Sequence, residues 1–101
     1  MLDMFFAPKG IALVGASRDP SKLGFAILDN LVKYGYAGNL YPINPKATEV
    51  LGLTCYASIT DIPGEVDLAV IVIPSKYVAP VLRECGEKGV KGAIIITAGF
   101  R

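Results

Sequence analysis

The sequence contains no histidine among its 101 residues. Histidine is the most frequent general base in enzymes and a common metal ligand, so its absence removes imidazole as a base, a metal ligand or a phosphoryl carrier. Cysteine is scarce, since only Cys55 and Cys85 are present and they stand far apart. Without a Cys-x-x-Cys pair, neither a zinc site nor a redox dithiol is predicted. We expect two buried thiols in a reducing cytosol.

An excess of charge of one sign is also missing. The formal net charge is +1 at pH 7, which provides no bulk field to attract nucleic acid or an anionic membrane. The N-terminal residues lack the basic and apolar regions of a signal peptide, and no apolar run approaches the length of a membrane span. We therefore expect a cytoplasmic protein without nucleic-acid or membrane partners, in which any anion site is local.

Hydrophobic residues make up 52% of the chain, and their order predicts an α/β fold. Apolar runs predict strands at 11–14, within 39–46, at 53–56 (a weak edge strand), at 66–73 and at 92–98. Segments of helical period follow the first and fourth of these runs. Right-handed crossovers then give a doubly wound, Rossmann-like, mainly parallel sheet with helices on both faces.

Local signals predict where the helices begin. Asp19 and Ser21 are both candidate N-caps of the first helix, and Pro20 suits its first turn. Ser75 is the candidate N-cap of the second helix. Residues 47–51 are expected to form a single helical turn.

The last predicted strand, 92–98, is too apolar to be left uncovered. A covering helix would have to come after it. We therefore expect residues 1–101 to be one domain of a longer chain, or a domain that packs against a partner. A paired or swapped edge is the alternative.

In such a sheet, ligands bind beyond the carboxyl ends of the strands, where four predicted loops converge: 15–22, 44–46, 74–76 and 97–100. The first loop leads into a helix whose free N–H groups and dipole favour an anion. Gly15 is expected to let the backbone approach a ligand. Gly24 is expected to let the helix pack tightly on the strand.

The end of the second strand indicates which nucleotide fits. NAD-binding domains usually place a carboxylate there for the ribose hydroxyl, whereas Tyr41–Lys46 has none before Glu49. Lys46 suits a phosphorylated ribose instead. The first loop also departs from Gly-x-Gly-x-x-Gly, because Gly15 is followed by Ala16. NAD is therefore disfavoured, and NADP and coenzyme A (CoA) remain.

Four segments carry a family resemblance: VGASRDPSKLG (14–24), YPINPK (41–46), VIPS (72–75) and ITAGF (96–100). In this order they resemble the CoA-binding domain of ADP-forming acyl-CoA synthetases, and more distantly the α subunit of succinyl-CoA synthetase. The resemblance covers essentially the whole chain. It implies CoA as the bound cofactor.

The candidate CoA-binding residues lie at the four loop tips: Gly15, Ala16, Ser17, Lys22, Asn44, Lys46, Ile73, Pro74, Ser75, Thr97 and Ala98. The resemblance implies that the first three line the phosphate end of CoA and that Lys46 lies near the adenosine end. Residues 73–75 would form a wall of the cleft, and Thr97 and Ala98 would flank the pantetheine arm. Plainer alternatives are that Ser17 only caps its own loop and that the lysines are solvated.

The resemblance also implies a reaction in which acyl-CoA forms from an acyl phosphate and CoA, with a phosphohistidine carrying phosphate to ADP. A chain without histidine cannot complete that cycle, so we expect no catalytic residue and no metal site here. The leading hypothesis is the CoA-binding module of an ADP-forming acetate–CoA ligase, with CoA or acyl-CoA and the remaining ligase domains or subunits as partners. The alternatives are the NADP-binding domain of an oxidoreductase, a stand-alone CoA-binding regulatory protein, or the CoA domain of a protein acetyltransferase.

Overall fold

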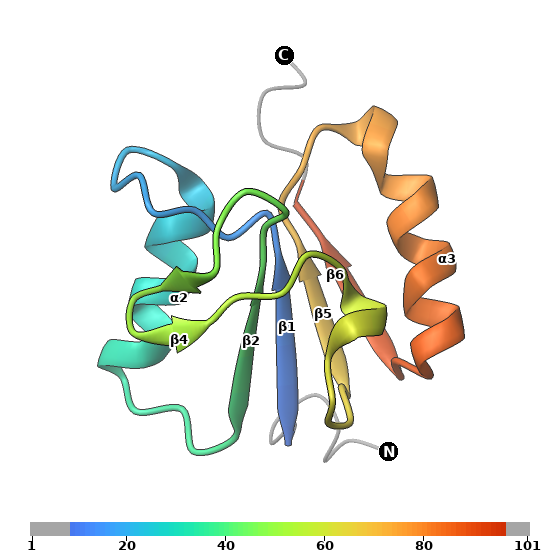
Figure 1. Ribbon diagram of the computed structural model, residues 1–101, viewed down its shortest axis with the longest axis horizontal. Helices are drawn as coiled ribbons and strands as arrows, with labels where there is room; N and C mark the ends of the chain where they lie inside the picture. The colour runs from blue at the N-terminus through green and yellow to red at the C-terminus, as the bar shows by residue number, and fades with distance from the viewer. Residues whose placement is uncertain (1–8, 97–101) are drawn as a thin grey trace.

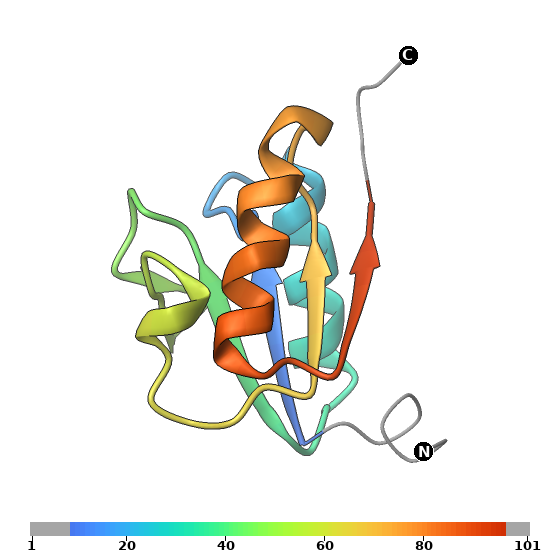
Figure 2. The same cartoon turned by 90° about the vertical axis from the view of Figure 1, so that its right-hand side faces the viewer.

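The computed structural model describes residues 9–96, and within them a four-stranded parallel sheet lies between helices α2 (Leu23–Lys33) and α3 (Val78–Lys88). The strands run in the order β2-β1-β5-β6, and their bounds are Asn39–Ile43, Gly10–Val14, Leu68–Ile71 and Gly92–Ile95. Figures 1 and 2 show the two helices on opposite sides of the sheet. The predicted doubly wound, Rossmann-like architecture is confirmed.

The alternation of side chains along the central strands explains why both faces need a helix. All five residues of β1 are buried. Ile11 and Leu13 belong to a core cluster that includes Leu28 of α2, whereas Ala12 belongs to the cluster that includes Cys85 of α3. A strand that is buried on both faces has apolar residues at successive positions, and the sequences of β1 and β5 show this pattern.

A small antiparallel pair, β3 (Glu49–Val50) and β4 (Leu53–Thr54), follows β2. The helical turn predicted over 47–51 is therefore wrong. Leu51 and Gly52 both have positive φ angles, of 52° and 78°, which is the geometry of a two-residue type I′ hairpin. The weak edge strand expected at 53–56 is divided in two: Leu53–Thr54 forms β4 and pairs with β3, whereas Tyr56 bridges Ile43 of β2 in parallel, at the edge of the main sheet.

The predicted cap of the first helix is also wrong. Lys22 is the N-cap of α2 and makes no side-chain capping bond. The Asp19 carboxylate instead accepts from the main-chain N–H and the hydroxyl of Ser21, at 2.9 and 2.8 Å. Pro20 stands inside this turn, before the helix. The capping residues thus close the loop locally, as Asp and Ser side chains commonly do.

Two short 3-10 helices, η1 (Ile59–Asp61) and η2 (Ser75–Tyr77), complete the described elements. Ser75 does not cap α3, as the sequence predicted, because η2 intervenes and Tyr77 is the N-cap of α3. The N–H of Tyr77 donates to the carbonyl oxygen of Pro74 at 2.9 Å. This tighter turn delays the start of α3 by three residues.

The edge strand β6 is open to solvent within residues 9–96. It lies next to β5, with Ile94 beside Val70 and Ile95 beside Ile71. Neighbours in register point to the same face, so the two isoleucines face opposite sides of the sheet; they are 47% and 45% exposed. The described residues thus leave the last strand without the cover that its composition calls for. No helix in this part of the chain is long and apolar enough to cross a membrane.

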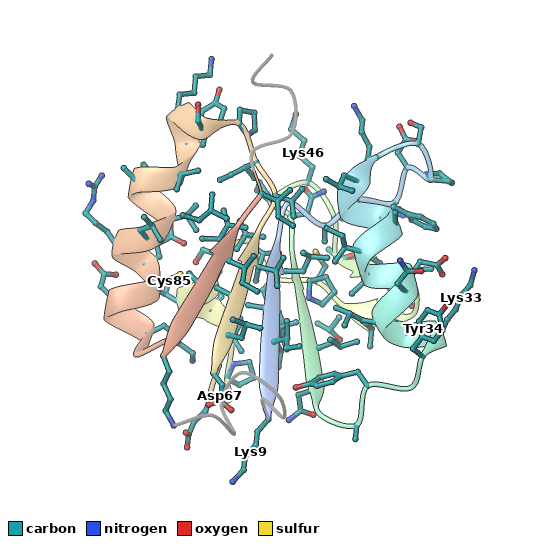
Figure 3. The ribbon with its side chains drawn as sticks, turned by 180° about the vertical axis from the view of Figure 1, so that it is seen from behind. Lys9, Lys33, Tyr34, Lys46, Asp67 and Cys85 are labelled. Atoms are coloured by element: carbon teal, nitrogen blue, oxygen red, sulfur yellow. The ribbon has the colours of Figure 1, made fainter. Side chains whose placement is uncertain are left out.

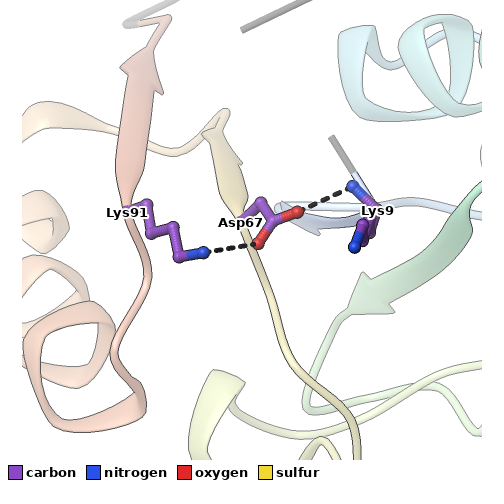
Figure 4. A network of polar contacts seen from close by, with 3 residues as sticks. All are labelled: Lys9, Asp67 and Lys91. Atoms are coloured by element: carbon purple, nitrogen blue, oxygen red, sulfur yellow. Dashed lines mark hydrogen bonds and ion pairs between the residues drawn. The ribbon is translucent and has the colours of Figure 1, made fainter. Parts of the chain in front are cut away.

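The amino ends of three strands are joined by Asp67, which is 8% exposed. Its carboxylate accepts from the main-chain N–H of Lys9 at 2.7 Å and lies 3.7 Å from the Lys91 ammonium (Figure 4). Its main-chain N–H donates to Gly10, and its carbonyl oxygen accepts from Lys91 and Gly92. One residue therefore holds together the starts of β1, β5 and β6.

We predict that Asp67→Ala lowers the free energy of unfolding by about 1–3 kcal/mol, because the part-buried N–H of Lys9 loses its acceptor. Urea unfolding followed by circular dichroism measures the change. Asp61→Ala removes an exposed carboxylate of the same charge and is the control. Equal unfolding midpoints for the two variants would contradict this role.

Candidate functional site

A cavity opens where the carboxyl ends of β1, β2 and β5 meet. Figure 1 shows these strand ends at the top of the sheet. The cavity has a volume of about 360 Å³ and is lined by Val14, Gly15, Ala16, Ile43, Asn44, Pro45, Ala57, Ile73, Val81 and Glu84. Most of these side chains are apolar, which is typical of small-molecule sites, and the position is the usual ligand site of open α/β sheets.

Gly15 begins the loop after β1, and the chain itself requires a glycine there. Its φ angle is +95°, and a Cβ atom at this position would lie 2.1 Å from the carbonyl oxygen of Val72. Its N–H donates to the carbonyl oxygen of Ile43 at 3.2 Å. We expected the space beside Gly15 to admit a ligand, but the main-chain carbonyl group of Val72, after β5, occupies it. Gly15 therefore shapes the floor of the cavity through main-chain packing.

Gly24 is packed against the same loop. A Cβ atom there would lie 1.9 Å from the carbonyl oxygen of Gly15, so the first turn of α2 touches the loop backbone directly. The close packing predicted for Gly24 is confirmed. It brings the amino end of α2, with its free N–H groups, beside the cavity wall.

Asn44 connects the loop after β2 to the loop after β1. Its Nδ2 donates to the carbonyl oxygen of Ala16 at 2.9 Å, and its Oδ1 accepts from the N–H of Lys46 at 2.8 Å. Its own N–H donates to Tyr56 at 2.9 Å. Because both the Nδ2 and the Oδ1 atoms of Asn44 are hydrogen-bonded to the main chain, its side chain holds the two loops in position.

Ser17 also shapes its own loop. Its Oγ accepts from the N–H of Asp19 at 3.0 Å, which matches the plainer reading of this residue and leaves the hydroxyl hydrogen available. The hydrogen bond from the main-chain N–H of Ser21 lowers the pKa of Asp19 below its usual value, helped by the Ser21 hydroxyl. The loop is thus closed by its own residues.

The two candidate lysines, Lys22 and Lys46, are exposed and do not line the cavity. The ion pairs found within residues 9–96 are Lys33 with Asp29 and Lys91 with Asp67. Neither candidate lysine is in such a pair, although the charge of Lys22 helps to lower the pKa of Asp19. Figure 3 shows Lys46 at the end of the sheet opposite Lys9 and Asp67. Both ammonium groups are therefore available to a ligand that extends out of the cavity.

The structure brings together some of the predicted residues and leaves others at the margin. Gly15, Ala16, Asn44 and Ile73 line the cavity, whereas Ser17, Lys22, Lys46, Pro74 and Ser75 lie on the adjoining loops outside its lining. Thr97 and Ala98 lie outside the described residues.

Sequence reasoning missed several lining residues, among them Ala57, Val81 and Glu84. Val81 and Glu84 are three residues apart on α3 and so share one helix face. That spacing was a usable signal, because the apolar stripe of the helix was already predicted. Ala57 carries no such signal, since it comes from the irregular segment after β4.

The two thiols have no part in the cavity lining. Both are free and buried, as predicted, and burial raises the pKa of Cys55 and of Cys85. Raised thiol pKa values make them poor nucleophiles at neutral pH. No cluster of metal-ligating side chains occurs in the described part of the chain.

A family model for the CoA binding domain matches residues 9–100. The chain belongs to this family. The CoA binding domain found here is also 58% identical, over 99% of its length, to the α subunit of the ADP-forming acetate–CoA ligase II of Pyrococcus furiosus. The chain spans about a fifth of that curated relative, 22% of its length.

Solved structures of relatives carry the same fold. An acetyl-coenzyme A synthetase 1 from Ca. Korarchaeum cryptofilum, solved with phosphate and ADP, is 53% identical, and its match has a TM-score of 0.94 over 99% of this chain and 22% of that one. A conserved hypothetical protein from Pyrococcus furiosus is 40% identical with a TM-score of 0.80, over 87% of this chain and 74% of that one. The domain thus occurs both in large synthetases and in much shorter chains.

Gly24→Ala is predicted to lower the free energy of unfolding by about 1–3 kcal/mol, because the new methyl group meets a carbonyl oxygen of the backbone that cannot move aside cheaply. Urea unfolding measures the change. Gly86→Ala is the matched control in α3, where a Cβ atom meets no described atom within 4 Å. That variant should gain up to about 1 kcal/mol from helix propensity. A Gly24 variant as stable as the Gly86 variant would refute the packing described here.

Proposed function

We propose that this chain is the CoA-binding module of an ADP-forming acyl-CoA ligase, acting on acetate or a related acid. The observation that carries the proposal is the coincidence of the family match over residues 9–100 with a cavity at the carboxyl ends of the parallel strands. The identity to the Pyrococcus furiosus acetate–CoA ligase subunit supports the acid–CoA ligase reading over the oxidoreductase, regulatory and acetyltransferase alternatives.

In this proposal, CoA lies across the loop tips. The N–H groups of Ala16, Ser17 and Arg18 in the loop and of Leu23 and Gly24 at the start of α2 meet its phosphates, since oriented main-chain N–H groups bind anions without adding net charge. Lys22 and Lys46 add two ammonium groups at the rim. Ile73, Pro74 and Ser75 wall the cleft, and Thr97 and Ala98 flank the pantetheine arm.

The module holds CoA as a substrate and performs no chemistry alone. With no histidine in the chain, the phosphoryl carrier of the ligase must come from another part of the protein or another subunit. Ile94 and Ile95 of β6 are exposed on opposite faces of the sheet, so each offers an apolar contact to a domain that packs on its own face. Burying an isoleucine of this exposure stabilises such a contact by on the order of 1 kcal/mol or more.

We expect CoA to bind this chain in an isothermal titration and NADPH not to bind. Both ligands carry an extra ribose phosphate, so electrostatics alone does not separate them, and only CoA carries a pantetheine arm. Tighter binding of NADPH than of CoA would overturn the proposal in favour of the oxidoreductase alternative.

Lys46→Ala is expected to weaken CoA binding by about 1.5–3 kcal/mol, the usual loss when a charged hydrogen bond is removed. Binding of 3′-dephospho-CoA should hardly change, because that ligand lacks the phosphate that Lys46 meets. Lys33→Ala removes the same charge from α2, where the lysine pairs with Asp29, and should leave both affinities unchanged. Equal losses for CoA and its dephospho form would place the Lys46 contact elsewhere on the ligand.

A further inference from the structure

The loop between β1 and α2, which is proposed to bind the phosphates of CoA, contains an exposed carboxylate, Asp19. The hydrogen bond from the main-chain N–H of Ser21 lowers the pKa of Asp19, and the Ser21 hydroxyl and the charge of Lys22 add to this effect. The group is therefore negatively charged at neutral pH. A negative charge weakens the binding of an anion nearby, so the charge of Asp19 does not explain what this residue contributes to the loop.

The hydrogen bonds of Asp19 close the middle of the loop into a turn. Its Oδ1 accepts from the main-chain N–H of Ser21 at 2.9 Å and from the Ser21 hydroxyl at 2.8 Å. Its main-chain N–H donates to the Oγ of Ser17 at 3.0 Å, and its carbonyl oxygen accepts from the N–H of Lys22 at 3.0 Å. One residue thus holds the loop on both of its sides.

This turn divides the N–H groups of the loop into two sets. The N–H groups of Asp19, Ser21 and Lys22 are used inside the turn, and Pro20 has none. The donors proposed for the phosphates lie before the turn, at residues 16–18, and after it, at the first two residues of α2. The first set begins at the lining of the cavity. The geometry of the turn therefore fixes how the two sets of donors lie relative to one another.

We propose that Asp19 is a positioning residue for CoA, whose Oδ1 holds the turn that orients these two sets of N–H groups toward the phosphates. The inference rests on the proposed binding of CoA and assigns Asp19 no contact with the ligand. Donors that are ordered before binding lose less conformational entropy when the ligand arrives. The benefit of Asp19 comes from one oxygen atom and is opposed by its charge.

Two substitutions separate the oxygen atom from the charge. Both hydrogen bonds from Ser21 end on Oδ1, so Asp19→Asn keeps an acceptor for them, whereas Asp19→Ala removes it. Because the two variants carry the same charge, the ratio of their dissociation constants reports the turn and not the charge. In isothermal titration, the alanine variant should bind CoA at least fivefold more weakly than the asparagine variant, about the cost of fixing the backbone of one residue.

The asparagine variant should bind CoA at least as tightly as the unmodified chain, because a repulsive charge is gone and the turn is kept. Asp61→Ala is the control, since it removes an exposed carboxylate from η1, outside this loop, and should change the affinity less than twofold. Amide hydrogen exchange at Ser21 should be faster in the alanine variant than in the asparagine variant. Urea unfolding of each variant measures its stability beside its affinity.

Each outcome separates this inference from the proposed function. If the unmodified chain binds CoA and the two Asp19 variants bind it equally tightly, CoA binding stands and the role of Asp19 is overturned. A lower unfolding midpoint with unchanged affinity in the alanine variant also overturns it, as does an asparagine variant that binds fivefold more weakly than the unmodified chain. If the unmodified chain does not bind CoA, the proposed function fails first and this inference fails with it. A fivefold loss in the alanine variant that asparagine restores supports both.

Discussion

The site depends on a crossing of three backbone segments at the end of β1. Gly15 lies against the carbonyl oxygen of Val72 on one side, and its own carbonyl oxygen lies against Gly24 on the other. Neither glycine position has room for a methyl group, so the loop, the end of β5 and the start of α2 are fixed relative to one another. The hydrogen bond from Asn44 to Ala16 then attaches the loop after β2 to this crossing. The cavity exists because these contacts hold its rim open at a set distance.

The two ends of the sheet show opposite uses of polar groups. At the amino ends of the strands, the Asp67 carboxylate is satisfied by a main-chain N–H and by the Lys91 ammonium. At the carboxyl ends, the described residues leave the Lys46 ammonium and the Glu84 carboxylate without an ion-pair partner. A polar group that is fully paired contributes stability, whereas an unpaired one near a cavity is available to a ligand.

The sequence was informative wherever one strong signal governed the outcome. The continuous apolar runs predicted the buried strands, and the loop between β1 and α2 predicted the ligand end of the sheet. The helix caps were predicted wrongly, because Asp and Ser side chains can form several alternative local hydrogen bonds. The side chains of Asp19, Ser21 and Ser75 therefore cap no helix. Residues 47–51 were misread because the positive φ angles of Leu51 and Gly52 depend on strand pairing, which no short window reveals. Glu84 was missed although its spacing from Val81 places it on the same helix face, because a charged residue beside an apolar stripe is usually solvent-exposed.

A nearly neutral chain faces a particular difficulty with a ligand that carries several phosphates, since its net charge of +1 provides no long-range attraction. In the proposed binding mode, main-chain N–H groups meet the phosphates without altering the net charge, and the crossing at Gly15 and the start of α2 orient these groups before any ligand arrives. Pre-oriented dipoles also avoid the entropy that flexible lysines lose when they become fixed.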